Sequence, residues 1–167
     1  MLGRTNGSSL RVADCGVNHD FWAGLPAGPQ RPGLLVRKVA NGTADSSVQA
    51  AMTATQCQQA LHNGQELVKS LPGNAPLLGE MGIGNTSAAS LLLARLTGLD
   101  VEVCTGAGTG LDAPAVPRKT AVLREVLARH PEVKAPLDAL AALGGFEMAT
   151  MVGAVLASGA QIVTVAL

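Results

Sequence analysis

Aromatic side chains and charge are both scarce in this chain of 167 residues. Phe21, Trp22 and Phe146 are its only aromatic residues, 2% of the total, and there is no tyrosine. A surface that binds single-stranded nucleic acid stacks bases on several aromatic rings, which this sequence does not offer. Charged residues make up 14%, and twelve basic side chains balance twelve acidic ones, whereas a nucleic-acid-binding domain normally carries a basic excess. We therefore expect no nucleic-acid partner.

Long apolar runs, a leader sequence and a metal-ligand pattern are also missing. Hydrophobic residues reach 47%, yet no uninterrupted apolar run approaches the roughly 18 residues of a membrane-spanning helix. Residues 1–7 contain no apolar core of a signal peptide. The three cysteines, Cys15, Cys57 and Cys104, are far apart and form no CxxC pair, which argues against a disulfide framework and a zinc site. The sequence thus predicts a cytoplasmic protein without a membrane segment, a metal or a cofactor.

The pattern of apolar residues, glycines and prolines predicts strands that alternate with helices. Strands are expected at residues 10–17, 75–81, 101–104 and 162–167, while 33–40 fits either a short strand or a turn of helix. Helices are expected at 52–70, 87–96, 118–130 and 146–159, with a short one opened by Pro136 that ends at Gly144-Gly145. In the helix at 146–159, apolar residues at 148, 151, 152, 155 and 156 predict the face that packs on the core. This order indicates an α/β fold, a Rossmann-like parallel sheet flanked by helices, with residues 1–167 in a single domain.

The segment from Gly79 to Thr86 places glycines between a predicted strand and a predicted helix. Gly82 and Gly84 let backbone N–H groups approach a ligand closely, and the following helix N-terminus attracts negative charge. We expect Asn85 and Thr86 to cap this helix and to hydrogen-bond a phosphate. The pattern lacks the lysine of a Walker A loop and the third glycine of a dinucleotide fingerprint. The alternative is a tight turn whose glycines serve packing alone.

Two charged side chains near glycine-rich segments are candidates for chemistry. Glu80 precedes the first segment, where a carboxylate suits ribose hydroxyls or a developing positive charge on a sugar ring. Lys119 follows a second glycine-rich segment, residues 106–110, and lies near a predicted helix start, where its charge opposes the helix dipole. This placement favours a contact between Lys119 and a phosphate. The alternatives are a solvated or salt-bridged glutamate and a surface lysine, and His19-Asp20 fits either an acid/base pair or an exposed loop.

Several motifs occur together in one order along the chain. They are VADCGV at 12–17, His19-Asp20, RKV at 37–39, Gly42-Thr43, AMT at 51–53, GEMGIGNT at 79–86, GTGLD at 108–112, Arg118-Lys119 and LGGFE at 143–147. In this combination the chain resembles the nicotinate-nucleotide–dimethylbenzimidazole phosphoribosyltransferases from Leu10 to Leu167. The resemblance implies a bacterial glycosyltransferase, of the pentosyltransferase class, that acts in cobalamin biosynthesis. Such enzymes join dimethylbenzimidazole to the phosphoribosyl group of nicotinate mononucleotide, which gives α-ribazole 5′-phosphate and releases nicotinate.

The resemblance also implies roles for single residues. Five consecutive residues would hold the phosphate and ribose of the nucleotide: Gly82, Ile83, Gly84, Asn85 and Thr86. Lys119 would reach the phosphate. Glu80 would lie beside the ribose, where it acts electrostatically.

The chain is short for this family, so we expect the fold to be truncated at both ends relative to family members. These carry an N-terminal helical portion and a C-terminal segment with the glutamate that serves as general base. That glutamate would lie beyond Leu167, so residues 1–167 would be the nucleotide-binding part of a larger enzyme, with weak or no activity alone. A non-catalytic nucleotide- or phosphate-binding remnant is the alternative function. The expected partners are nicotinate mononucleotide, the benzimidazole base and a second copy of the chain, since the family forms homodimers.

Overall fold

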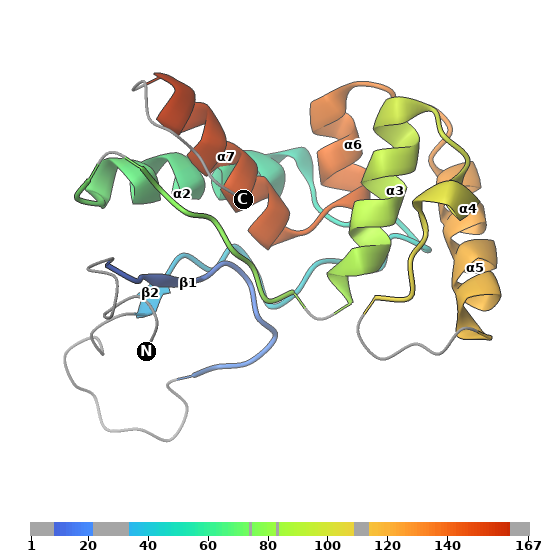
Figure 1. Cartoon of the computed structure of the whole chain (residues 1–167), viewed down its shortest axis with the longest axis horizontal. Coiled ribbons are helices and arrows are strands. Elements are labelled where there is room, and N and C mark those ends of the chain that lie inside the picture. The colour runs from blue at the N-terminus through green and yellow to red at the C-terminus, as the bar shows by residue number, and fades with distance from the viewer. Residues whose placement is uncertain (1–8, 22–33, 74, 83, 109–113, 161–167) are drawn as a thin grey trace.

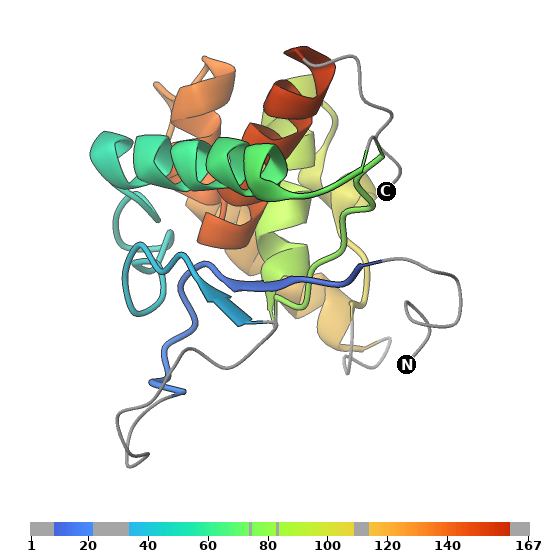
Figure 2. The same cartoon turned by 90° about the vertical axis from the view of Figure 1, so that its left-hand side faces the viewer.

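The computed structural model describes residues 9–21, 34–73, 75–82, 84–108 and 114–160, and Figure 1 shows their arrangement. Two short strands come first, β1 (Val12–Asp14) and β2 (Leu34–Val36). Six helices follow within this part of the chain: α2 (Ala54–Ser70), α3 (Asn85–Thr97), α4 (Val101–Cys104), α5 (Ala115–Arg129), α6 (Pro136–Leu143) and α7 (Phe146–Ala160). The strands lie beside the crossed pair α2 and α7, and the helices α3 to α6 form a second group (Figures 1 and 2).

The two strands form a small parallel sheet in which Val12 lies opposite Leu34 and Asp14 opposite Val36. The expected α/β class, a parallel sheet flanked by helices, is confirmed. The apolar run at 10–17 predicts a strand with apolar side chains in the core, but Val12 is 52% exposed and Asp14 is the buried residue of β1. The described sheet therefore adds little apolar surface to the core, which the helices supply.

Two further segments that the sequence predicts as strands have other conformations. Residues 75–81 contain a single bridge residue, Leu77, and no strand. Residues 101–104 form the helical turn α4, because the Asp100 side chain caps it by accepting a hydrogen bond from the Glu102 N–H at 2.8 Å. The predicted strand at 162–167 lies outside the described residues.

The helices that the sequence predicts are confirmed, and local signals set their ends. Thr53 and Gln56 form a capping box at the start of α2, in which each side chain accepts from the other residue's backbone N–H, at 3.1 and 2.9 Å. Gly98 ends α3 in the left-handed conformation, with φ +75°. Pro136 is the first residue of α6, where its missing N–H costs nothing.

Helices α2 and α7 cross at close range because a glycine of each lies at their contact. A Cβ added to Gly64 of α2 would overlap the backbone carbonyl oxygen of Thr150. A Cβ added to Gly153 of α7 would overlap the backbone carbonyl oxygen of Leu61. The two backbones therefore approach as closely as their own atoms allow, which maximises dispersion contacts between them.

This close crossing reverses the predicted orientation of α7. Apart from Phe146, its buried face consists of small residues: Ala149, Thr150, Gly153, Ala154, Ala157 and Ser158. The predicted core face at 148, 151, 152, 155 and 156 is wrong, because Val152, Val155 and Leu156 are exposed. Despite its apolar character, neither α7 nor any other helix in the described ranges is long enough and apolar enough to cross a membrane.

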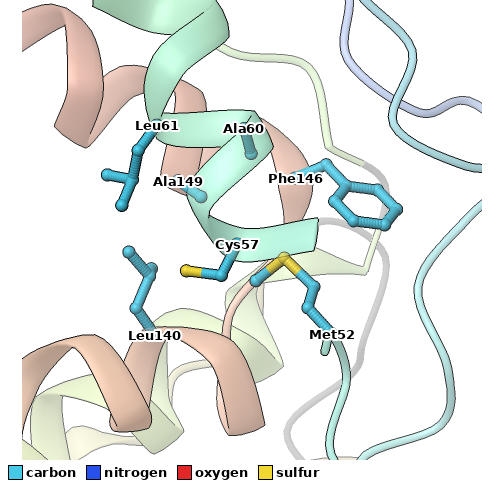
Figure 3. Close-up of a cluster of buried hydrophobic side chains, with 7 residues drawn as sticks. All are labelled: Met52, Cys57, Ala60, Leu61, Leu140, Phe146 and Ala149. Carbon is cyan, nitrogen blue, oxygen red and sulfur yellow. The ribbon is translucent and has the colours of Figure 1, made fainter. Parts of the chain in front are cut away.

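An apolar cluster joins α2 to α6 and to the start of α7. Seven buried residues form it: Met52, Cys57, Ala60, Leu61, Leu140, Phe146 and Ala149 (Figure 3). Full burial of a large apolar side chain contributes about 1.5–3 kcal/mol. The ring of Phe146 also packs against Gly16, in the loop that follows β1. The cluster thus fixes the start of α7 beside the end of β1.

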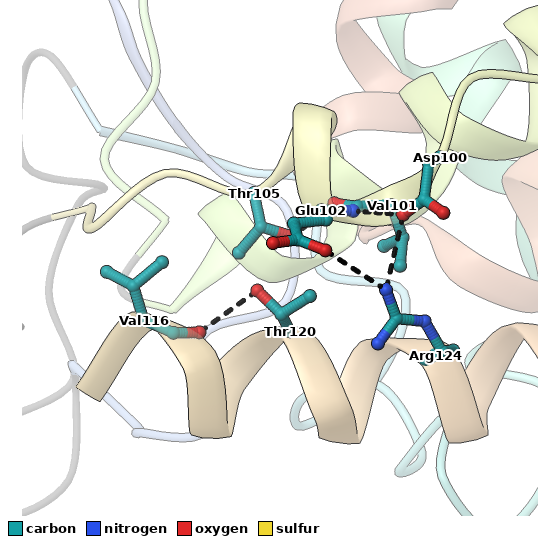
Figure 4. Close-up of polar contacts among 7 residues, drawn as sticks. All are labelled: Asp100, Val101, Glu102, Thr105, Val116, Thr120 and Arg124. Atoms are coloured by element: carbon teal, nitrogen blue, oxygen red, sulfur yellow. Dashed lines mark hydrogen bonds and ion pairs between the residues drawn. The ribbon is translucent and has the colours of Figure 1, made fainter. Parts of the chain in front are cut away.

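Helices α4 and α5 are joined by polar contacts, drawn in Figure 4, and by the packing of a buried apolar residue. Arg124 of α5 pairs with Asp100 and Glu102 at 3.3 and 3.5 Å. All three side chains are exposed, and exposed pairs contribute only about 0–1 kcal/mol each. Val101, which is 4% exposed, packs with Leu123 in a second apolar cluster and holds α4 more firmly. This packing brings the segment that follows α4 toward the start of α5.

Candidate functional site

The glycine turn before α3 forms as the sequence indicates, with one correction. Gly84 is the N-cap of α3 and has φ +85°, a conformation that favours glycine. The backbone N–H of Asn85 donates to the Gly82 carbonyl oxygen at 3.2 Å and closes the turn. The expectation that Asn85 and Thr86 cap the helix is wrong, because α3 has no side-chain cap and both residues lie inside its first turn. The first turn of α3 therefore has no side-chain cap, and the positive end of its dipole faces the glycine turn.

The turn that follows Glu80 holds its carboxylate. Oε2 accepts hydrogen bonds from the Gly82 N–H at 2.5 Å and from the side-chain amide of Asn85 at 2.6 Å. A Cβ added to Gly82 would lie 2.5 Å from Nδ2 of Asn85, so a side chain at this position would displace the Asn85 amide. Glu80 is exposed, and a ligand can reach it while the turn fixes its direction.

Lys119 links the two glycine-rich segments. Its Nζ donates to Oγ1 of Thr86 and to the carbonyl oxygen of Gly106, both at 3.0 Å. Gly108 has φ +65° and lies so close to Thr86 that an added Cβ would be 2.7 Å from Oγ1. The ammonium is thus held beside the first turn of α3, where it adds to the positive end of the helix dipole.

The structure brings six of the seven predicted site residues together: Glu80, Gly82, Gly84, Asn85, Thr86 and Lys119. Ile83 lies outside the described residues. Their contacts with a ligand remain predictions. His19 and Asp20 are exposed on the loop after β1, and the His19 ring meets Phe21 edge-on with ring centroids 5.1 Å apart.

Asp14 and Lys38 form an ion pair to which the sequence gives no role. Oδ2 of Asp14 lies 3.3 Å from Nζ of Lys38, and Oδ1 accepts from the backbone N–H groups of Gly16 and Val17 at 3.1 and 3.0 Å. Lys38 also donates to the carbonyl oxygens of Val17 and His19 at 2.6 and 2.7 Å. The pair shapes the loop after β1. An aspartate two residues before a glycine is the signal that could have indicated such a turn.

Cys15 lies beside the first turn of α7. Burial raises the pKa of its thiol above the usual value, a hydrogen bond with Thr150 opposes this, and the charges of Glu147 and Asp14 raise the pKa further. The thiol therefore stays protonated near neutral pH and is not an activated nucleophile. The charge of Glu147 therefore acts on this thiol, whereas the sequence indicates only a helix start at this position.

The chain is similar to known proteins of one family over nearly its whole length. A family model described as Phosphoribosyltransferase matches residues 1–167. A nicotinate-nucleotide–dimethylbenzimidazole phosphoribosyltransferase of Variovorax paradoxus is 62% identical over 93% of this chain and 43% of its own length. The enzyme of the same name from Dechloromonas aromatica is 48% identical over 95% of this chain and 45% of its own length. The chain belongs to the nicotinate-nucleotide–dimethylbenzimidazole phosphoribosyltransferase family.

Solved structures of this family share the fold. The structure of CobT from Thermus thermophilus matches with a TM-score of 0.83 and 34% identity, over 98% of this chain and 48% of that one. The nicotinate-nucleotide–dimethylbenzimidazole phosphoribosyltransferase from the same organism matches with a TM-score of 0.81 and 33% identity, over 98% and 47%. The resemblance drawn from the sequence motifs is thereby confirmed. The chain spans slightly less than half the length of these family members.

Proposed function

We propose that this chain binds nicotinate mononucleotide and takes part in the transfer of its phosphoribosyl group to 5,6-dimethylbenzimidazole. The products are α-ribazole 5′-phosphate, used for the lower ligand of cobalamin, and nicotinate. The observation that supports this function most directly is Lys119, held against Thr86 at the N-terminus of α3 with Glu80 fixed on the adjoining turn. The relatives described above are named for the same two substrates.

The arrangement suits a reaction in which charge develops on the ribose. A phosphate at the first turn of α3 meets backbone N–H groups and the Lys119 ammonium, both of which favour negative charge. As the bond from C1′ to nicotinate breaks, positive charge builds on the ribose ring, and the fixed carboxylate of Glu80 stabilises it. The benzimidazole nitrogen forms the new bond to C1′ and its ring N–H loses a proton. We assign no residue of this chain to that last proton transfer.

Gly84→Ala tests the anion site against a control at the other end of the same helix. Gly84 and Gly98 both have positive φ, and an added Cβ meets nothing within 4 Å at either position. Alanine should therefore cost a similar strain of about 1–2 kcal/mol at both. We expect Gly84→Ala to weaken nicotinate mononucleotide binding about tenfold, the loss of roughly one hydrogen bond, because the N–H groups of the turn shift. Gly98→Ala, the control, should leave the affinity unchanged. Calorimetry measures the affinity of each variant for nicotinate mononucleotide, and equal affinities in Gly84→Ala and Gly98→Ala would contradict the proposed site.

An assay of the same protein for α-ribazole 5′-phosphate separates the enzyme from the binding remnant. We expect nucleotide binding with little turnover, because a positioned general base contributes about 10²- to 10⁴-fold and none is assigned here. Turnover at the rate of longer family members would show that this chain is an enzyme by itself. Failure to bind the nucleotide and to form the product would contradict the proposed function.

We further propose that the chain associates with a second copy of itself. Large apolar side chains are exposed on β1, before the glycine turn and on the outer face of α7, among them Val12, Leu77, Met81 and Leu156. Exposed apolar surface of this kind favours association. Sedimentation at high micromolar concentration should show dimers, and Leu156→Lys should shift them toward monomer. A stable monomer of the unaltered chain would contradict this proposal.

A cytoplasmic location is part of the proposal. Cys15, Cys57 and Cys104 are free thiols in the described part of the chain. Free thiols agree with a reducing compartment, because oxidising compartments favour disulfides.

A further inference from the structure

Two features of the fold hold the carboxylate of Glu147 in the first turn of α7. Phe146, the preceding residue, is 3% exposed and packs against Gly16 in the loop after β1. Gly145 is buried, and a Cβ added to it would lie 2.5 and 2.6 Å from the two carboxylate oxygens of Glu147. The carboxylate therefore folds back over Gly145 at the start of the helix, where the dipole favours negative charge.

The side-chain amide of Asn85 lies between Glu147 and Glu80. Its Nδ2 donates to Oε2 of Glu80 at 2.6 Å and reaches Oε1 of Glu147 at 3.5 Å. The amide thus connects the segment before the glycine turn, the start of α3 and the start of α7. An amide NH₂ group carries two protons, one for each carboxylate. The amide cannot turn over, because its oxygen would then face two negative charges.

We propose that Glu147 is a positioning residue of the nucleotide site: through the Asn85 amide it fixes the direction in which Glu80 presents its carboxylate to the ribose. This proposal rests on the function proposed above. Glu80 lies on an exposed segment without regular structure, whereas Glu147 lies on a helix clamped to α2 through Gly64 and Gly153. A side chain on a loop needs such support from a rigid element to keep a productive geometry.

The proposal separates two kinds of ligand. In the proposed function phosphate binds at the first turn of α3 and at Lys119, whereas the Glu80 carboxylate faces the ribose. Ribose depends on Glu80 and therefore on Glu147. If Glu147 only stabilised the start of α7, its removal would lower the stability of the chain and would change the affinities for nucleotide and for phosphate by the same factor.

Calorimetry with nicotinate mononucleotide and with inorganic phosphate on the full 167-residue chain tests this difference. We expect Glu147→Ala to weaken nucleotide binding about tenfold and phosphate binding less than about twofold, about 1.4 and 0.4 kcal/mol. Glu147→Gln keeps an acceptor oxygen for Asn85 and should restore most of the nucleotide affinity. Glu125→Ala, at an exposed position of α5, is the matched control and should change neither affinity.

Glu80→Ala supplies the decisive comparison. It should weaken nucleotide binding at least as much as Glu147→Ala, and the double variant should be no weaker than Glu80→Ala alone, because residues that act through one group are not additive. Unchanged nucleotide affinity in Glu147→Ala, or losses that add in the double variant, would overturn the proposal. An unaltered chain that binds neither ligand would instead overturn the proposed function.

A second measurement needs no ligand and therefore stands even if the proposed function fails. Hydrogen exchange of the two Asn85 side-chain protons, followed by NMR, should be slow for both in the unaltered chain. Glu147→Ala should speed the exchange of one proton, and Glu147→Gln should leave it slow. Equal exchange in the unaltered chain and in Glu147→Ala would overturn the bridge through Asn85.

Discussion

Gly153→Ala is expected to destabilise the chain by about 3 kcal/mol, at the upper end of the usual cost of overpacking. The new methyl group would overlap the carbonyl oxygen of Leu61 on α2, a backbone atom that cannot move aside as a flexible side chain can. Helices α2 and α7 must then separate, which loosens the apolar cluster around Phe146 (Figure 3). Thermal unfolding followed by circular dichroism should show a fall in Tm of roughly 6–12 °C for a chain of this size.

Gly159 provides the control on the same helix. Nothing lies within 4 Å of a Cβ added there. Gly159→Ala should therefore raise stability by up to about 1 kcal/mol, the difference in helix propensity between the two residues. A lower free energy of unfolding in Gly153→Ala and a higher one in Gly159→Ala would show that the close contact with α2 causes the loss of stability. If Gly153→Ala proved as stable as Gly159→Ala, the close approach of the two helices would be contradicted.

The helices could be predicted from the sequence because their signals are local. A capping box at Thr53, a terminating glycine at Gly98 and an opening proline at Pro136 each act within one turn of the chain. The strands could not be predicted as well, since pairing depends on a partner that is distant in sequence. Residues 101–104 look like a strand by composition, yet the cap from Asp100 makes them a helix. Short apolar segments are ambiguous for this reason.

The orientation of α7 could not be predicted because a search by hydrophobicity selects large apolar residues for the buried face and passes over glycine and alanine. A search for large apolar residues at helical spacing finds Val152, Val155 and Leu156, which are exposed. The face that is buried carries Gly153, whose missing side chain is what lets α2 approach. A stripe of small residues on one helix, together with Gly64 on the other, is the signal that would have indicated the crossing.

Much of the candidate site could be predicted because its residues are close in sequence. The segment from Glu80 to Thr86 forms one turn, and its glycines indicate that turn directly. Lys119 is inferred from a helix start at residue 118, but α5 begins at Ala115, so Lys119 lies in its second turn and the helix dipole does not explain its position. The bridge from Asn85 to Glu147 could not be predicted, because 62 residues separate the two side chains and only the packing of α7 brings them together.

Lys119→Ala is expected to weaken binding of nicotinate mononucleotide and of phosphate about ten- to hundredfold, since a hydrogen bond to a charged group contributes about 1.5–3 kcal/mol. The ammonium is already held by Thr86 and Gly106, so binding requires little further ordering of this long side chain. The loss should be similar for the two ligands, in contrast to Glu147→Ala, because the lysine acts on the phosphate that they share. Calorimetry with each ligand measures both affinities.

Arg118→Ala is the matched control for this loss. Arg118 is the adjacent residue of α5, it is exposed, and its removal changes the net charge of the chain by the same amount. Long-range attraction of an anion should therefore fall equally in the two variants, and a direct contact alone should distinguish them. We expect Arg118→Ala to weaken binding less than about twofold at moderate ionic strength, where exposed charges are screened. Equal losses in the two variants would mean that Lys119 contributes only to the general field, and the phosphate would then have to bind away from the first turn of α3.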